Sequence, residues 1–259
     1  MSRRAVLVPL ALVSLLTSAF AAAPTNSFNI VTTAGKTVGN ASYTISNDKN
    51  GYHLVGKFQY RLGSSTQSVS EDSNRMTGSV MFNEGQFNED FKVAEDGNFI
   101  SGYTQNATTQ MMSSFQPNKA GTLVTVNQIQ GGVGLGAHDL TLPKPAFLVV
   151  PDFDPGSLQL FLTTALAHPH GDKTYLFVVP AGSNPRAREA SLYVTLQLSP
   201  DTLEGTLDGK PVHLLHYLMG YHVGSADLYA DDAGTLMRAD MGPLGVSYIR
   251  VKFVLAGAK

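Results

Sequence analysis

Apolar and polar residues alternate along most of the chain from residue 27 onwards, in short stretches separated by turn residues. Side chains of a β-strand point alternately to its two faces, so this alternation predicts strands with one buried face. In the stretch 52–62, for example, one face carries Tyr52, Leu54, Gly56, Phe58 and Tyr60. Turn signals such as Asp208-Gly209 lie between neighbouring stretches, as in an antiparallel meander. The predicted strands are 27–33, 41–46, 52–62, 78–82, 86–94, 98–104, 108–115, 122–129, 173–179, 190–198, 203–207, 212–219, 226–230, 235–239 and 246–255.

One segment departs from this period and has the spacing of a helix. Asp154 can cap a helix, and Pro155 can occupy its first position. The pattern therefore predicts one amphipathic helix over 156–167 that packs against the sheet. Its expected apolar side carries Leu158, Phe161, Leu162, Ala165 and Leu166, and its expected polar side carries Gln159, Thr163 and Thr164.

These patterns predict an all-β fold with one main helix, built as a large curved antiparallel sheet or an open half-barrel. The chain has 259 residues, of which 43% are hydrophobic, enough to form a core without disulfides or a structural metal. No linker rich in proline and serine divides the sequence, so we expect a single β-rich domain over 22–259. A division near 140–155, a stretch with several prolines, is the alternative.

Residues 1–21 have the pattern of a secretory signal peptide. Arg3 and Arg4 precede an apolar run, and Ala19-Phe20-Ala21 resembles a cleavage site. Cleavage after Ala21 is preferred to cleavage after Ala23, where Pro24 would adjoin the scissile bond. The apolar run is shorter than the ~20 residues that span a bilayer, so no transmembrane segment is expected after cleavage. The sequence has no cysteine to carry a lipid anchor, and we expect an exported protein of the periplasm or the outer membrane surface.

Charge and composition narrow the class of partners. Only 15% of the residues are charged, against roughly 25% in typical globular proteins. The formal net charge is −2, whereas a nucleic-acid-binding protein carries a basic excess or a basic stripe. We therefore expect no nucleic-acid partner. The glycine-rich stretch 131–136 is similar to a dinucleotide loop but lies in no parallel βαβ unit, so it is predicted to be a flexible crossover loop and no cofactor is expected.

Two short motifs and the order of elements resemble a group of bacterial envelope proteins. The motifs are Asp154-Pro155-Gly156-Ser157, which opens the helix between two meanders, and the closing stretch 226–238. The group consists of uncharacterised periplasmic domains with one strongly curved antiparallel sheet, similar in shape to lipoprotein-localisation carriers. Those carriers hold acyl chains in the concave face of the sheet, so the resemblance implies a lipid or another apolar ligand in that position.

The leading prediction is therefore an exported, non-enzymatic envelope protein that binds an apolar ligand or an envelope partner. A helix across an open sheet can gate or fill the concave face, and ordinary core packing is the alternative for each of its residues. A structural or assembly protein of the envelope is a second possibility. The candidate ligand-binding residues are Leu158, Phe161, Leu162, Leu166 and Tyr217.

Three histidines raise the alternative of a metal-dependent or other hydrolase. His213 and His216 are three residues apart, and His222 follows them. On a helix this spacing would place the first two imidazoles together, but 212–219 is predicted to be a strand, whose positions three apart face opposite ways. A zinc site needs three or four converging ligands, so paired strand residues are the preferred interpretation. No Gly-x-Ser-x-Gly motif is present, and no catalytic residue is assigned.

Overall fold

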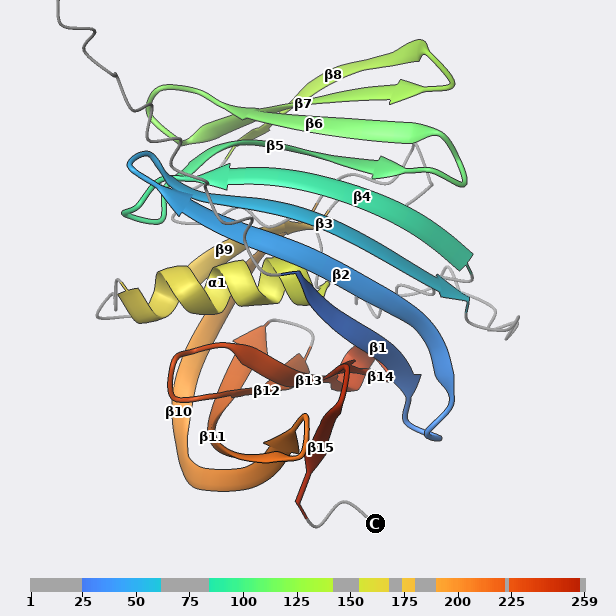
Figure 1. Cartoon of the computed structure of the whole chain (residues 1–259). Helices are drawn as coiled ribbons and strands as arrows, with labels where there is room; N and C mark the ends of the chain where they lie inside the picture. Colours follow the sequence, from blue (N-terminus) through green and yellow to red (C-terminus); the bar gives the residue numbers. More distant parts are fainter. Residues whose placement is uncertain are drawn as a thin grey trace, which may run out of the picture.

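The structure is a computed structural model, and it describes residues 25–61, 84–141, 154–167, 174–179, 190–221 and 224–256. The signal-like residues 1–21, the predicted strand 78–82 and His222 lie outside these ranges. The first strands are β1 (Asn26–Thr32), β2 (Thr37–Asp48), β3 (Gly51–Arg61), β4 (Glu84–Val93), β5 (Phe99–Asn106), β6 (Met111–Pro117), β7 (Leu123–Gln130) and β8 (Val133–Thr141). They are followed by helix α1 (Pro155–Ala167) and then by β9 (Thr174–Val179), β10 (Ala190–Leu207), β11 (Lys210–Tyr221), β12 (Gly224–Ala230), β13 (Leu236–Met241), the 3₁₀ turn η1 (Gly242–Leu244), β14 (Val246–Arg250) and β15 (Phe253–Leu255) (Figure 1).

All 15 strands of the described residues belong to one antiparallel sheet, which confirms the predicted fold class. The order along the sheet is β15-β10-β11-β12-β13-β14-β1-β2-β3-β4-β5-β6-β7-β8, and β9 pairs with β10 beside that path. Most neighbours are consecutive hairpins, as a meander requires. The exception at the centre is β1, which pairs with β14 and so joins the N-terminal meander to the C-terminal one.

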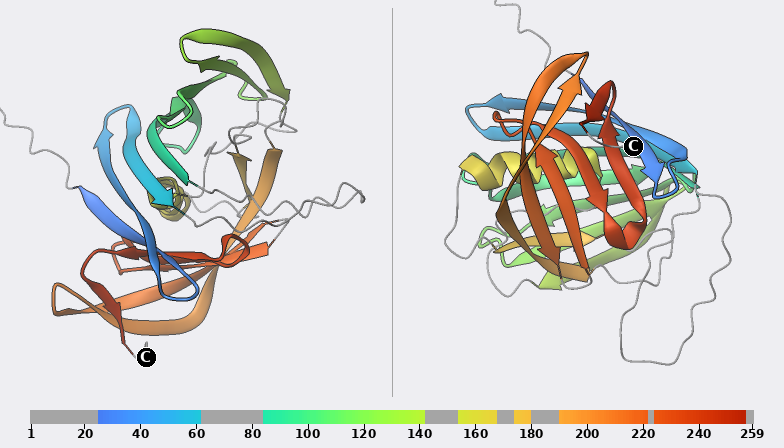
Figure 2. Two further views of the ribbon diagram at one scale, coloured as in Figure 1. Left: turned by 90° about the vertical axis from the view of Figure 1, so that its right-hand side faces the viewer. Right: turned by 90° about the horizontal axis from the view of Figure 1, so that it is seen from below.

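The sheet curves around helix α1. In Figure 2, α1 is seen between the strands β1–β3 on one side and β11–β14 on the other. Register shifts interrupt the pairs β1–β2, β4–β5, β7–β8, β10–β11 and β12–β13. Such bulges bend a strand and increase its twist, which accounts for the curvature. We call the face that carries the main core the inner face, and the opposite one the outer face.

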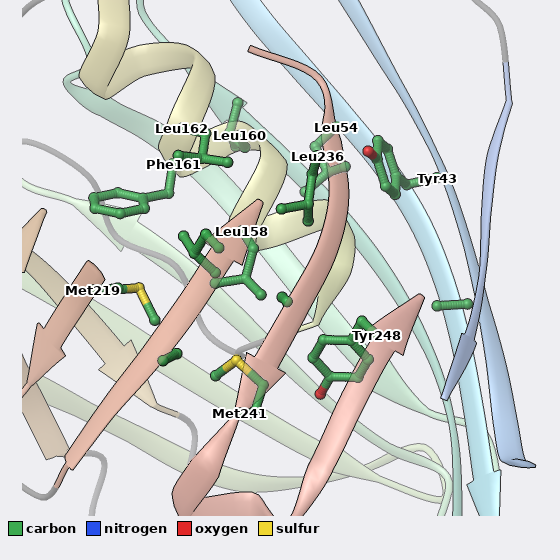
Figure 3. Close-up of a cluster of buried hydrophobic side chains, with 14 of the residues drawn as sticks. Tyr43, Leu54, Leu158, Leu160, Phe161, Leu162, Met219, Leu236, Met241 and Tyr248 are labelled. Atoms are coloured by element: carbon green, nitrogen blue, oxygen red, sulfur yellow. The ribbon is translucent and has the colours of Figure 1, made fainter. Parts of the chain in front are cut away.

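The main core lies on the inner face, around the helix. α1 packs against β2, β3 and β13, and Figure 3 shows its leucines beside Leu236 and Met241 of β13. A smaller cluster around Leu214, Met237 and Phe253 lies apart from this core. The helix therefore connects the two meanders through side chains as well as through the chain.

The helix begins as predicted but is not amphipathic. Asp154 Oδ1 accepts hydrogen bonds from the backbone N–H groups of Gly156 (2.7 Å) and Ser157 (3.1 Å), the geometry of an N-cap. Gln159 and Thr164, expected on a polar side, are buried, whereas Leu166 is 41% exposed. The prediction of one apolar stripe was wrong because the curved sheet contacts the helix from two directions.

Two strand predictions also need correction. Residues 190–198 and 203–207 were expected as separate strands, but β10 runs through both, with a register shift between Leu198 and Thr202. The stretch 131–136, expected as a crossover loop, instead turns the β7–β8 hairpin. Gly131 and Gly132 have φ of 57° and 83°, which is the conformation a two-residue hairpin loop requires.

No helix in the described parts of the chain is long and apolar enough to cross a membrane.

Candidate functional site

A row of polar side chains crosses the inner face of β3–β7. Strand pairing places Glu89 of β4 opposite Gly56 and opposite Thr104 of β5. Ser113 of β6 lies opposite Thr104, and Gln128 of β7 lies opposite Ser113. Glu89, Thr104 and Ser113 are all buried. Since strand positions of equal parity share a face, these four side chains form a continuous line, which we call the polar row.

Apolar side chains border the polar row on both sides. One flanking row runs through Leu54, Phe91, Gly102, Phe115 and Val126, and the other through Phe58, Phe87, Asn106 and Met111. Phe58 and Phe87 stack with their ring centroids 4.6 Å apart. Phe91 and Phe115 approach at 6.3 Å with tilted rings. The inner face of β3–β7 is therefore mostly apolar, with the polar row as a continuous line of hydrogen-bonding groups and with Asn106 and Gln130 as further polar positions in the second flanking row.

The polar row ends at a pair of buried carboxyl groups, Glu89 and Asp154, which we call the carboxyl pair. Glu89 is 2% exposed and Asp154 is 4% exposed. The two carboxyl groups lie together beside Gly156, where an added Cβ would be 2.8 Å from Glu89 Oε1 and 3.1 Å from Asp154 Oδ1, and the Ser157 hydroxyl donates to Glu89 Oε2 at 3.3 Å. Glycine at position 56 makes room for the pair, because a Cβ there would overlap the Glu89 carboxyl.

Burial controls the protonation of this pair. Desolvation raises the pKa of Asp154, and hydrogen bonds from Glu89, Ser157 and Gly156 oppose that rise only in part. A carboxylate transferred from water into an apolar interior loses hydration, so the neutral acid is favoured there. The pair therefore holds a proton at pH values at which exposed carboxyl groups are ionised.

Gln159 connects α1 to both meanders. Its Oε1 accepts hydrogen bonds from the Tyr43 hydroxyl of β2 (3.2 Å) and from the backbone N–H of Leu236 in β13 (2.6 Å). Its Nε2 donates to the carbonyl oxygen of Gly234 at 2.9 Å. Burial raises the pKa of Tyr43, which keeps this hydroxyl a neutral donor. The buried amide thus fixes the position of the helix, and with it the carboxyl pair.

The candidate ligand-binding residues of the helix lie in the core. Leu158, Phe161 and Leu162 are fully buried, as is most of Tyr217 on β11, and Figure 3 shows the three helix side chains among core residues. Leu166, near the helix end, is instead partly exposed. The structure therefore brings four of the five side chains into one apolar cluster and leaves Leu166 at its margin.

His213 and His216 form separate pairs with aspartates. His213 Nδ1 lies 2.8 Å from Asp232, and His216 Nε2 lies 2.8 Å from Asp227. The hydrogen bond that His213 donates to Asp232 raises the pKa of this exposed imidazole. His213 and His216 occupy opposite faces of β11, as strand alternation predicts, since Tyr217 belongs to the main core and Leu214 to the smaller cluster. Within the described ranges, no three metal-ligating side chains gather.

The outer face carries a second group of polar residues. His216 stacks on Tyr229 at 4.8 Å, and Arg238 Nε donates to both carboxylate oxygens of Asp240 at 2.8 and 2.9 Å. Asp227 lies opposite Asp240 on the neighbouring strand. Each of these carboxyl groups has a partner of its own, His216 for Asp227 and Arg238 for Asp240. Arg238 and Asp240 also line an open hollow of about 410 Å³ between β1, β13 and β14. These charges are paired with one another, which accounts for their arrangement without a ligand.

Comparisons with protein-family models, with curated protein sequences and with solved structures find no match for this chain. The resemblance to curved-sheet envelope domains therefore stays a prediction.

Sequence reasoning missed both the polar row and the carboxyl pair. One signal was present, because Glu89 occupies an inward position of its strand, together with Phe87, Phe91 and Val93. A charged residue at such a position is rarely buried without a partner. Its neighbours Thr104 and Ser113 become recognisable only when the strand register is known.

Proposed function

We propose that this protein is an exported, non-enzymatic binding protein that holds an amphiphilic molecule on the inner face of β3–β7. The apolar chain of the ligand lies along the two flanking rows, and its polar head faces the polar row. The observation that carries this proposal is the line of Glu89, Thr104, Ser113 and Gln128 between rows of aromatic and aliphatic side chains. Ligand sites commonly combine an apolar lining with a few placed polar groups.

The charges on the inner face of β3–β7 indicate which chemical class of ligand head group fits there. Strands β3 and β4 direct their basic side chains outward, where Lys57, Arg61 and Lys92 are exposed. Among the described residues, the inward positions of β3–β8 carry no lysine or arginine, and Glu89 is acidic. A carboxylate head would lie near the carboxyl pair without a cation to neutralise it. A head with hydroxyl, amide or ammonium groups can donate hydrogen bonds to the row instead.

The helix limits where the ligand lies. α1 packs against β2 and β3 of the N-terminal meander and against β13 of the C-terminal one. Leu158, Phe161 and Leu162 are packed within the core there. The proposed position is therefore beside the helix, over β4–β7, and the helix forms one wall rather than the contact surface itself.

Native mass spectrometry of the full chain with three ligands of equal chain length tests this proposal. The ligands are a monoacylglycerol, the corresponding fatty acid and the corresponding alkylamine. We expect complexes with the monoacylglycerol and the alkylamine and a markedly weaker complex with the fatty acid. Absence of all three complexes would overturn the proposal, and a preference for the fatty acid would overturn the assignment of the head group.

Two isosteric substitutions distinguish a role of the polar row in ligand binding from a general loss of stability. Thr104→Val removes a hydroxyl from the polar row, whereas Thr44→Val removes one from the outer face of β2. Both threonines lie in strands, where valine is well accommodated. We expect Thr104→Val to weaken binding of the monoacylglycerol several-fold and Thr44→Val to leave it unchanged. Equal effects of the two substitutions would contradict a role for the row.

A further inference from the structure

The carboxyl pair lacks one hydrogen-bond donor. Asp154 Oδ1 accepts from two backbone N–H groups at the start of α1. Asp154 Oδ2 is buried and accepts no hydrogen bond from the ordinary donor groups of the described chain. The side chain hydrogen-bonded to this carboxyl is Glu89, which has no hydrogen to donate when both groups are ionised. Satisfying Oδ2 therefore requires a proton between the two carboxyl groups.

Repulsion leads to the same conclusion. Two buried carboxylates in contact cannot both ionise without a large cost, so such a pair retains one proton and titrates as a unit. The N-terminus of α1 stabilises a negative charge on Asp154. The Ser157 hydroxyl, which donates to Glu89, stabilises a negative charge on that residue. The neutral member supplies the missing donor.

The charged groups that face the pair do not replace this proton. On β2 the Tyr43 hydroxyl interacts electrostatically with Asp154 and is engaged with Gln159. Arg250 of β14 and Asp231, in the turn before β13, act on Tyr43 together with Asp154. Asp231 is itself occupied by the backbone N–H groups of Ala233 and Thr235. The inward side chains of β13 that contact the helix region, Leu236, Ala239 and Met241, carry no charge.

We propose that one proton shared between Glu89 and Asp154 holds the N-terminus of α1 in the sheet, and that loss of this proton as the pH rises releases the helix. The proposal does not depend on ligand binding. Released from Asp154, the first turn loses its cap. Gln159, one turn further on, then loses its link between β2 and β13.

The direction of the pH dependence follows from linkage. Because burial raises the pKa of Asp154 in the folded state, the folded protein binds a proton more strongly than the unfolded chain does. This contribution to stability is complete below the ordinary aspartate range and is lost as the pH rises through the folded-state pKa. The helix is thus expected to be docked most firmly in acid, and its docking is expected to weaken as the pH rises toward the folded-state pKa of the pair.

Hydrogen–deuterium exchange of the full chain over a series of pH values tests the proposal, with rates corrected for intrinsic exchange. In the unsubstituted protein we expect protection of residues 155–167 to fall by about tenfold per pH unit between the ordinary aspartate range and the folded-state pKa of the pair, the slope for one proton, and to level off above that pKa. Asp154→Asn keeps the cap acceptor and provides a permanent N–H toward Glu89. Its protection should not change with pH. Asp96→Asn, in the exposed turn before β5, is the matched control and should behave as the unsubstituted protein.

Two outcomes would overturn the proposal. The first is an identical pH profile for the unsubstituted protein and Asp154→Asn. The second is the absence, at pH values just above the ordinary aspartate range, of an infrared band of a protonated carboxylic acid that Glu89→Gln alters. Because the infrared measurement on the unsubstituted chain needs no variant to detect the acid, it decides the matter even if Asp154→Asn does not fold.

Discussion

Replacing Gln159 by methionine separates the hydrogen bonds of this side chain from its packing. Methionine has a similar length and shape, so the space within the core stays filled. The substitution removes the partner of three groups: the Tyr43 hydroxyl, the N–H of Leu236 and the carbonyl of Gly234. Since α1 bridges β2 and β13 through these bonds, we expect a large loss of stability.

The magnitude follows from the number of groups left without partners. A buried polar group without a hydrogen bond costs about 1–3 kcal/mol. Three such groups, taken near the lower end because all are neutral, give about 3–6 kcal/mol. Thr163→Val is the matched control, since it removes only the bond from Gln159 Nε2 to Thr163 Oγ1. That loss should stay below about 1 kcal/mol.

Urea denaturation at neutral pH measures both variants. With a slope of about 2–3 kcal/mol/M for a chain of this size, Gln159→Met should lower the midpoint by about 1–3 M. Thr163→Val should shift it by less than about 0.5 M. Equal midpoints for the two variants would refute the role assigned to Gln159, as would a loss below about 1 kcal/mol for Gln159→Met.

Three further predictions concern other parts of the fold. Phe115→Ala removes a fully buried ring and should lower the free energy of unfolding, measured by urea denaturation, by about 3–5 kcal/mol. Leu135→Lys on exposed β8 should change it by no more than about 0.5 kcal/mol. Comparable losses for the two variants would contradict the assigned burial. Gly209→Val should destabilise the β10–β11 hairpin by about 1 kcal/mol or more, because φ at this turn is 75°; an unchanged melting temperature would be inconsistent with this turn. His216→Gln should leave metal content unchanged on elemental analysis, because this imidazole is paired with Asp227, and stoichiometric zinc lost on substitution would contradict the pairing.

Local pattern was sufficient for the elements. Alternation predicted most strands, including the inward face of β3, because a half-buried strand must alternate whatever its neighbours are. The start of α1 was likewise predicted from Asp154 and Pro155, since an N-cap depends on residues adjacent in sequence. The hairpin at Gly131 and Gly132 was missed. The same glycines suit a loop and a tight turn, and only pairing of β7 with β8 decides between them.

Strand register decided what the elements do together. Glu89, Thr104 and Ser113 are distributed over three strands, and nothing in the spacing along the chain aligns them. The contact of Glu89 with Asp154 depends on the helix packing against the curved sheet, which also buries Gln159 on its expected polar side. The sequence by itself thus determined most of the strands, the helix cap and the all-β class, because these follow from interactions between near neighbours. Only the tertiary structure decided which polar groups are buried together, because that depends on the pairing and curvature of strands far apart in the chain.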